Sequence, residues 1–212
     1  MPLTIFFVHG WGFNSAIWDS ISELLPDWPK LKLDRGYFGA PRTPVPETPC
    51  IAVTHSFGTM LALADPPPHC IGLIAVNGFD RFVAHSGSPG VHRRVLKRMI
   101  GQFETEPEAV LREFRNRCGC CAPFTLGNVD LLGNDLQDLA NIDYSQYCAR
   151  IELPVLSLQG DADPILPKAM CDNVFSGVHR LERLTLGGGH LLPLTEPVAC
   201  ASAIREFAGV IA

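Results

Sequence analysis

The feature that most restricts the fold of this chain is a series of short apolar runs, each ending at a glycine or a polar corner. Several runs are almost continuously hydrophobic, which is typical of strands buried on both faces of a parallel sheet. The apolar runs are 3–8, 31–33, 51–53, 71–76, 155–158 and 181–186, and helical patterns lie between most of them, at 16–25, 57–64, 168–175 and 197–210. This alternation predicts an α/β fold with a compact, mostly parallel sheet of about six strands.

Two intervals depart from the alternation. Prolines at positions 41, 44, 46 and 49 exclude a helix between 35 and 50 and predict an extended loop. The interval 79–149 contains helical patterns without a strand: an apolar stripe over 91–100, a helix opened by the capping-box pattern at 105–108, and a third pattern over 129–140. We therefore predict a core formed by 1–78 and 150–212, with 79–149 inserted as a helical lid.

Polar corners follow the predicted strands at the edge where functional groups gather in such sheets. They are His9-Gly10-Trp11-Gly12, then Ser56, then Gly160-Asp161-Ala162-Asp163, and finally Gly187-Gly188-Gly189-His190. Serine, aspartate and histidine follow one another here in the order of the α/β-hydrolase triad. The fold class predicted is therefore the alpha/beta-hydrolase fold.

Each residue type has a chemical reason. Ser56 needs a base to take its proton, and His190 supplies an imidazole on a glycine-rich loop. Asp163 would hold the other ring nitrogen; we prefer it because Pro164 fixes the loop after it, and Asp161 remains the alternative. The backbone N–H groups of Phe57 and Trp11 are the predicted donors to the oxyanion.

Each of these residues also has an ordinary explanation when taken alone. Ser56 would be a helix N-cap, His190 a loop histidine and Asp163 a turn residue. Three such residues in the required order, preceded by the HGWG corner, favour the enzyme. The elbow departs from the G-x-S-x-G pattern because Thr54 stands at its first position. The remaining histidines have no such support and are interpreted as structural or solvated: 55, 69, 85, 92 and 179.

Composition narrows the class of protein further. The sequence is 47% hydrophobic and 18% charged, as expected for a globular chain, with neither a long apolar span nor a basic secretory n-region at its start. Its eight scattered cysteines suit a reduced, cytoplasmic protein. The cluster at 118–121 lacks a second metal-binding pair, so no metal is expected. A net charge of −5 argues against a nucleic-acid binder.

With these motifs in place, the sequence resembles the α/β-hydrolase esterases that cleave pimeloyl-acyl-carrier-protein methyl ester in biotin synthesis. The resemblance is carried by HGWGFNSAIW at 9–18, HSFG at 55–58, the stretch 131–167 that ends in GDADPILP, and GGGHLLPLTEP at 187–197. AVNGF at 75–79 is similar to a second, shorter group of esterases that serve the same step. The chain departs from a typical member by beginning close to the HGWG strand and by its loop at 35–50.

The resemblance implies a serine carboxylesterase that needs no metal or organic cofactor and uses Ser56, Asp163 and His190, with Trp11 and Phe57 as oxyanion donors. It also implies an acyl carrier protein as partner, held by basic lid residues. Between 81 and 118 there are eight Lys or Arg and four Glu, an excess of +4. The candidate carrier-binding residues are Arg93, Arg94, Lys97, Arg98, Arg112, Arg115 and Arg117. The alternative for these residues is a solvated helix face.

The same residues are compatible with two other functions. One is a thioesterase or general carboxylesterase acting on small or acyl substrates. The other is a non-catalytic relative that has kept the pocket without turnover. Neither a nucleic acid nor a membrane is expected as a partner.

Overall fold

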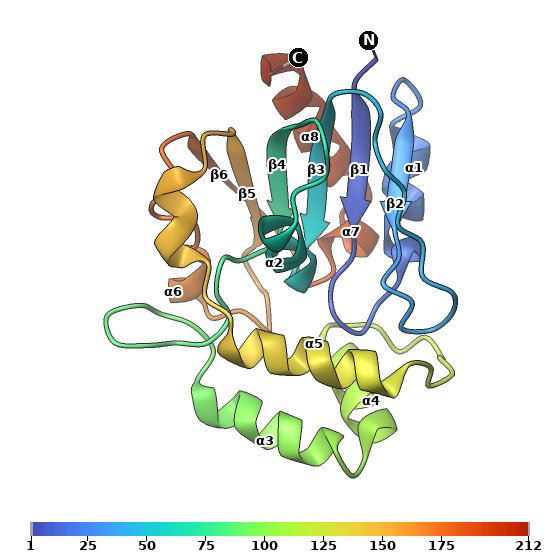
Figure 1. The fold of residues 1–212 in the computed structure, drawn as a ribbon, viewed down its shortest axis with the longest axis vertical. Helices are drawn as coiled ribbons and strands as arrows, with labels where there is room; N and C mark the ends of the chain where they lie inside the picture. Colours follow the sequence, from blue (N-terminus) through green and yellow to red (C-terminus); the bar gives the residue numbers. More distant parts are fainter. Residues whose placement is uncertain (1, 212) are drawn as a thin grey trace.

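The computed structural model describes residues 2–211 and contains one sheet of six parallel strands (Figure 1). In spatial order the sheet runs β2-β1-β3-β4-β5-β6, and every neighbouring pair is parallel. The strands are β1 (Thr4–Val8), β2 (Lys30–Leu33), β3 (Cys50–His55), β4 (Cys70–Val76), β5 (Val155–Gly160) and β6 (Leu181–Leu186). The predicted parallel α/β sheet is confirmed.

Helices cover both faces of the sheet. One face packs against α1 (Asp19–Leu24), α7 (Leu192–Thr195) and α8 (Pro197–Ile211), and the other against α2 (Phe57–Ala64) and α6 (Lys168–Cys171). Strands β1, β3 and β5 are buried along their whole length, as their continuous apolar sequences predict. Among residues 2–211, no helix is both long and apolar enough to cross a bilayer.

Two predicted helices are shorter than their sequence patterns. The first begins as a separate 3-10 turn, η1 (Ser15–Trp18), because the Asn14 side chain accepts a hydrogen bond from the Ala16 N–H and caps it. The second ends at Cys171 and continues as turns to Phe175, whose φ of 58° cannot be part of a right-handed helix.

The order of the strands creates a crevice between β1 and β3. The chain leaves β1 toward α1 on one face of the sheet, whereas it leaves β3 toward α2 on the other face. Ligands of open α/β sheets bind at such a reversal, outside the carboxyl ends of the strands. The loop at 35–50 is extended as predicted and returns from β2 to β3 past an isolated bridge between Asp34 and Arg42.

The predicted lid helices lie across the carboxyl ends of the strands (Figure 1). They are α3 (Arg93–Phe103), α4 (Pro107–Arg117) and α5 (Val129–Asn141), and the 3-10 helix η2 (Ser145–Arg150) leads from α5 back toward β5. The predicted capping box is wrong. Glu106 is the N-cap residue and makes no side-chain cap bond, because Pro107 starts the helix one residue later; the Thr105 hydroxyl donates to the Gln102 carbonyl instead.

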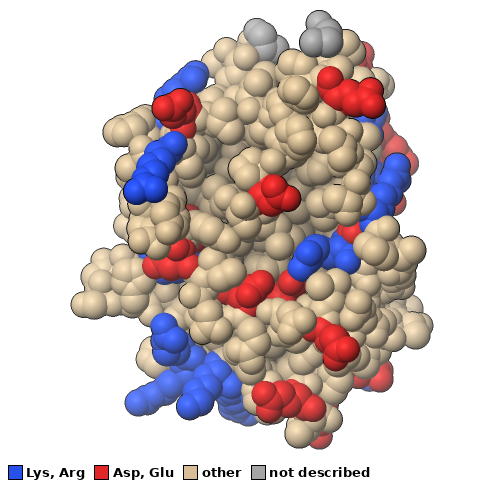
Figure 2. Space-filling model, viewed as in Figure 1, with Lys and Arg blue, Asp and Glu red and all other residues tan. Residues whose placement is uncertain are grey.

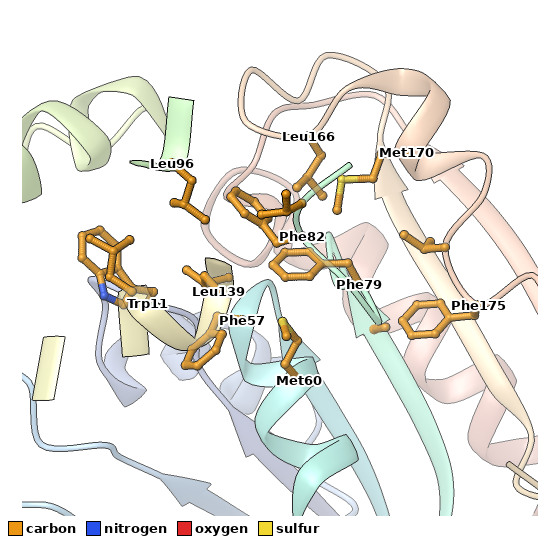
Figure 3. Packing of buried hydrophobic residues seen from close by; sticks show 14 of the residues in the cluster. Trp11, Phe57, Met60, Phe79, Phe82, Leu96, Leu139, Leu166, Met170 and Phe175 are labelled. Carbon is orange, nitrogen blue, oxygen red and sulfur yellow. The ribbon is translucent and has the colours of Figure 1, made fainter. Parts of the chain in front are cut away.

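A hydrophobic cluster joins the lid helices to the core (Figure 3). Leu96 of α3 and Leu139 of α5 point into the same group of buried side chains as Phe57 and Met60 of α2. Burying apolar surface stabilises the folded state by roughly 25 cal/mol per Å². These large buried side chains therefore stabilise the packing of the lid against the core. The apolar faces of α3 and α5 therefore pack against the core, although Val95 of α3 stays half exposed.

Polar contacts fix α5 in addition to this packing. The Arg35 guanidinium pairs with the Asp135 carboxylate through two nitrogens, and the Tyr37 hydroxyl donates to the same carboxylate. One helical turn earlier, the Trp11 indole donates to the Leu132 carbonyl at 2.8 Å. Residues of the HGWG corner and of the 35–50 loop thus hold one lid helix.

Replacing Asp135 by asparagine is expected to lower the free energy of unfolding by about 2 kcal/mol. The Asp135 side chain is 2% exposed, and its replacement leaves the partly exposed Arg35 guanidinium and the buried Tyr37 hydroxyl without their carboxylate partner. Urea unfolding followed by circular dichroism measures the change. Asp130→Asn, at an exposed position of the same helix, is the control and should change stability by less than about 0.5 kcal/mol. Equal effects of the two variants would contradict a stabilising role for the buried pair.

Candidate active site

Ser56 occupies a strained turn between β3 and α2. Its backbone has φ 51° and ψ −125°, a conformation that non-glycine residues rarely adopt. The turn is tight because Gly58 lies against the end of β1, where an added Cβ would be 2.5 Å from the His9 carbonyl oxygen. Ser56 makes no side-chain cap bond to α2, so the ordinary N-cap interpretation is wrong.

Thr54 fits the first position of the elbow for a specific reason. Its hydroxyl is 2.7 Å from the Thr59 hydroxyl and 3.2 Å from the Ile74 carbonyl oxygen, so the polar atom is satisfied although Thr54 is fully buried. The position at this corner that has no room for a side chain is Gly78, where an added Cβ would lie 2.1 Å from the Thr59 hydroxyl oxygen.

Ser56, His190 and Asp163 form one continuous hydrogen-bonded chain. The His190 Nε2 atom is 3.0 Å from the Ser56 hydroxyl oxygen, and the His190 Nδ1 atom is 2.8 Å from Asp163 Oδ2. The side chains of His190 and Asp163 are 0% and 1% exposed, and Ser56 is also buried. Three corners that are distant in the sequence therefore meet with the geometry of a nucleophile, a base and an orienting acid.

The Asp163 carboxylate is held in its ionised form. Burial opposes ionisation, but the attraction of His190, its hydrogen bond and the backbone N–H groups of Leu166 and Ile165 outweigh it, so the pKa of Asp163 is lowered. Those two N–H groups donate to Oδ1 at 3.0 and 2.7 Å. Asp161 is exposed and accepts from the Gly188 N–H at 3.0 Å. The structure thus brings Asp163, and not Asp161, beside the imidazole.

Two residues next to this chain were not singled out by the sequence as functional. His55 is fully buried, and its Nε2 atom is 2.8 Å from the His190 carbonyl oxygen. Burial, followed by repulsion from His190, lowers the pKa of His55 to about 3, so its ring is neutral. Asn77, directly after β4, donates from Nδ2 to Asp163 Oδ2 at 2.6 Å. The sequence could have identified Asn77 by its position, because it is a polar residue directly after a predicted strand.

The other histidines agree with their sequence interpretation. Each of them is exposed: His69, His85, His92 and His179. His85 also pairs with Asp143, its Nε2 atom lying 3.1 Å from the carboxylate. His55 is the structural member of the group.

The two predicted oxyanion donors lie on either side of the crevice. Phe57 is the first residue of α2, and the first-turn N–H groups of a helix have no acceptor within the helix. Trp11 lies in the turn after β1, next to Gly10, where an added Cβ would be 3.0 Å from the Ser56 Cβ. The HGWG corner therefore touches the serine, and the donor roles of Trp11 and Phe57 stay predictions.

A cavity of about 510 Å³ opens between the lid and the core. Its lining is mostly apolar and comes from α3 and the segment just before it, from α4 and from the loop after β5. The lining residues include Val91, Val95, Leu96, Met99, Phe114, Ile165 and Leu166. Phe114 connects this cavity to the candidate site, since its ring centre lies 6.4 Å from that of His190. The volume falls in the range of small-molecule pockets.

The predicted basic lid residues divide into two groups. Residues of the first group are exposed: Arg93, Arg94, Lys97 and Arg98 on α3, and Arg112 and Arg117 on α4. Figure 2 shows positive side chains gathered at the lower left of the molecule, over α3. Arg112 pairs with Glu108, and Arg117 donates to the Pro164 carbonyl at 3.2 Å.

Arg115 does not belong to that surface, and its predicted place in the carrier-binding group is wrong. It is buried, donates to the Gly12 carbonyl at 2.8 Å and lies 5.0 Å over the Phe13 ring. The reason is helical spacing, because Arg115 follows the buried Leu111 by four residues and shares its inward face. Arg115 therefore attaches α4 to the HGWG corner.

Comparison with known proteins agrees with this geometry. A profile of the family described as "Alpha/beta hydrolase family" matches residues 5–203. The chain is 28% identical to a pimeloyl-[acyl-carrier protein] methyl ester esterase of Legionella pneumophila, over 79% of this chain and 77% of that protein. It is 26% identical to the biotin biosynthesis bifunctional protein BioHC of Cellvibrio japonicus, over 94% of this chain; the chain spans about half, 46%, of that relative's length.

Solved structures show the same fold at lower sequence identity. The esterase EaEST from Exiguobacterium antarcticum superposes with a TM-score of 0.83 at 13% identity, covering 98% of this chain and 92% of that chain. A thermophilic esterase from Thermogutta terrifontis gives 0.73 at 16% identity, covering 100% and 91%.

Proposed function

Because the chain belongs to the alpha/beta hydrolase family, we propose that it is a serine carboxylesterase that hydrolyses the methyl ester of an acyl chain carried by an acyl carrier protein. The observation that carries the catalytic part is the hydrogen-bonded chain from Ser56 through His190 to Asp163. The proposed substrate comes from the names of distant relatives, the pimeloyl-[acyl-carrier protein] methyl ester esterases, which are 22–28% identical to this chain.

The geometry supports a two-step reaction. His190 Nε2 removes the proton of the Ser56 hydroxyl as its oxygen attacks the ester carbonyl, and ionised Asp163 stabilises the imidazolium. The tetrahedral oxyanion is stabilised by the N–H groups of Phe57 and Trp11. His190 then gives its proton to the leaving methoxide, methanol departs, and a water activated by the same base releases the free acid. No step requires a metal or an organic cofactor.

The cavity between lid and core is suited to the acyl part of such a substrate. Apolar side chains such as Leu96, Met99 and Leu166 line it, and Phe114 lies between its wall and His190. A chain of methylene groups gains about 0.8 kcal/mol for each group buried on apolar surface. Asp163 also lines the cavity, so an ester at the end of this chain would lie beside the Ser56–His190–Asp163 chain.

The exposed basic face of α3 is the proposed contact for the acyl carrier protein. Arg93, Arg94 and Lys97 point to solvent, and the neighbouring Arg98 is exposed and also lines the cavity. An acidic carrier docked there would place its acyl group at the mouth of the cavity. Complementary charge chiefly raises the rate of encounter and excludes other partners.

Reversing the charge of this face is expected to affect carrier-bound substrates selectively. Arg93→Glu, Arg94→Glu and Lys97→Glu together should lower kcat/KM for methyl pimeloyl-carrier protein about 10-fold or more, because electrostatic steering changes association rates by at least that factor. Hydrolysis of a short nitrophenyl ester should stay unchanged. The control is Arg180→Glu with Arg205→Glu, two exposed positions before β6 and on α8. Equal losses on both substrates would contradict a docking role.

Two experiments test the substrate itself. The first compares kcat/KM for methyl pimeloyl-carrier protein with that for short nitrophenyl esters and acyl thioesters; a preference for the carrier-bound methyl ester supports the proposal. The second expresses the chain in a biotin auxotroph that lacks its own esterase, where growth without biotin is expected. Activity without that preference, and no growth, would favour a general carboxylesterase or thioesterase.

A further inference from the structure

Asn77 lies next to the three corners that carry Ser56, Asp163 and His190. It follows β4 directly, is fully buried, and has a left-handed backbone with φ 46°. Its own N–H donates to the Leu158 carbonyl at 2.8 Å, and the Ser56 N–H donates to the preceding Val76 carbonyl at 3.1 Å. Asparagine tolerates this region better than other side chains apart from glycine, but the conformation still has a cost.

The Asn77 amide makes its shortest contact with the candidate acid. Nδ2 lies 2.6 Å from Asp163 Oδ2, which is the same oxygen that lies 2.8 Å from His190 Nδ1. A second contact, at 3.4 Å, reaches the Gly189 carbonyl just before His190. Oδ1 of Asp163 is meanwhile held by the N–H groups of its own loop. Rotation of the carboxylate is therefore prevented from both sides.

The orientation of the amide is determined by chemistry. Turning it over would bring its oxygen against the Asp163 carboxylate, where two acceptors repel. In the observed orientation, Asn77 Oδ1 is buried without a hydrogen-bond partner among the described residues. An unpaired buried carbonyl is unfavourable. The fold thus tolerates both a strained backbone and an unpaired oxygen at a position where the result is one donor directed at the acid.

From this geometry we infer that Asn77 is a positioning residue for the reaction, which acts through Asp163 by fixing the carboxylate toward His190 and by sharing the negative charge of Oδ2. The inference rests on the proposed function, because it assigns Asn77 to the proposed triad. Loss of the Asn77 amide is predicted to have two effects. The Asp163 carboxylate should rotate more freely, and its Oδ2 atom should bind the imidazolium form of His190 more strongly.

Three other ionisable groups near this pair, His55, Cys171 and Cys118, stay uncharged during a pH titration of activity. The pKa of His55 is about 3 for the reasons given above. Burial, followed by the nearby Asp163 charge, raises the pKa of Cys171 to about 11 and raises that of Cys118 as well. A shift of the acid limb in an Asn77 variant is therefore assigned to the Asp163–His190 pair.

Two variants separate the amide from the backbone strain. Asn77→Gly removes the side chain and accepts a positive φ without strain. Asn77→Asp keeps the shape but replaces the donor with a second carboxylate beside Asp163. His69→Gly is the matched control, since His69 has φ 59° and is exposed before β4, away from the site. Glycine relieves strain equally at both positions, so any difference between the two variants belongs to the Asn77 amide.

The test is steady-state hydrolysis of a short nitrophenyl ester from about pH 5 to 9, with thermal unfolding as a check of folding. We expect Asn77→Gly to lower kcat about 10- to 100-fold with little change in KM, and to move the acid limb of kcat/KM to higher pH. Asn77→Asp should lose at least as much activity and move the limb further. His69→Gly should match the unmodified protein in both respects.

Two results would overturn the inference while leaving the proposed function standing. One is an Asn77→Gly protein with an unchanged kcat and pH profile. The other is a folded Asn77→Gly protein whose loss appears only in KM. Failure of the proposed hydrolase activity has a different signature, because the unmodified protein would then hydrolyse no ester in the same assay. Failure of the carrier substrate alone would appear only in the comparison of substrates.

Discussion

Ser56→Ala is expected to abolish ester hydrolysis, with a fall in kcat of at least about 10⁴-fold, because removing a nucleophile that acts as one unit with its base has effects of this size. The variant should fold normally, since alanine removes one hydroxyl whose partner in the structure is His190 Nε2, 3.0 Å away. Hydrolysis of a nitrophenyl ester measures the loss, and thermal unfolding checks the fold.

A fluorophosphonate probe tests the same residue without a substrate. The unmodified protein should gain the mass of one phosphonyl group, located at Ser56 by peptide mapping, and Ser56→Ala should gain none. Ser176→Ala is the control, because Ser176 is exposed in the turns before β6; its labelling should be unchanged. A folded, unmodified protein that resists labelling would instead support a non-catalytic relative that binds a ligand.

The second large effect is expected at Asp163. Asp163→Asn should lower kcat by about 10⁴-fold, because an amide at this position stabilises the wrong tautomer of the histidine and cannot stabilise the imidazolium. The contact concerned is that of Oδ2 with His190 Nδ1 at 2.8 Å. The structure adds a consequence for pH: since the pKa of Asp163 is lowered, the carboxylate is charged throughout the neutral range and its role is lost only in acid.

Asp161→Asn is the matched control for this prediction. Asp161 belongs to the same loop, is exposed and accepts from the Gly188 N–H, two residues before His190. We expect it to retain activity within about 10-fold, because an amide oxygen still accepts that hydrogen bond. A larger loss at Asp161 than at Asp163 would show that the acid loop rearranges during turnover and that the observed pairing is not the working one.

The large effects are thus predicted at residues that the sequence singled out, whereas several contacts that support them were not visible there. The strands, most of the helices and the triad corners follow from local patterns, because a continuous apolar run ending at a glycine or polar corner is a property of a few neighbouring residues. The capping box at 105–108 shows the limit of this reasoning: the pattern is present, but Pro107 sets where α4 begins.

Contacts across the fold account for the remaining differences. Arg115 was placed with the exposed basic residues by its charge, although its spacing from Leu111 directs it inward to the Gly12 carbonyl. Thr54 departs from the elbow pattern, and its fit depends on Thr59 and Ile74. Helical spacing places Arg115 on the inward face of α4, but no local pattern reports its partner Gly12 or the Ile74 partner of Thr54, because both lie on other segments of the chain.

By itself the sequence determined a parallel α/β sheet, the family, and the serine and histidine that face one another across the crevice. The choice of Asp163 over Asp161, the contact of that acid with Asn77 and the contact of Arg115 with the Gly12 carbonyl were decided by tertiary structure. The physical reason is the same in each case: a hydrogen bond requires its two atoms to lie about 3 Å apart, to within a few tenths of an ångström, and only the packed sheet and lid set such distances between segments far apart in sequence.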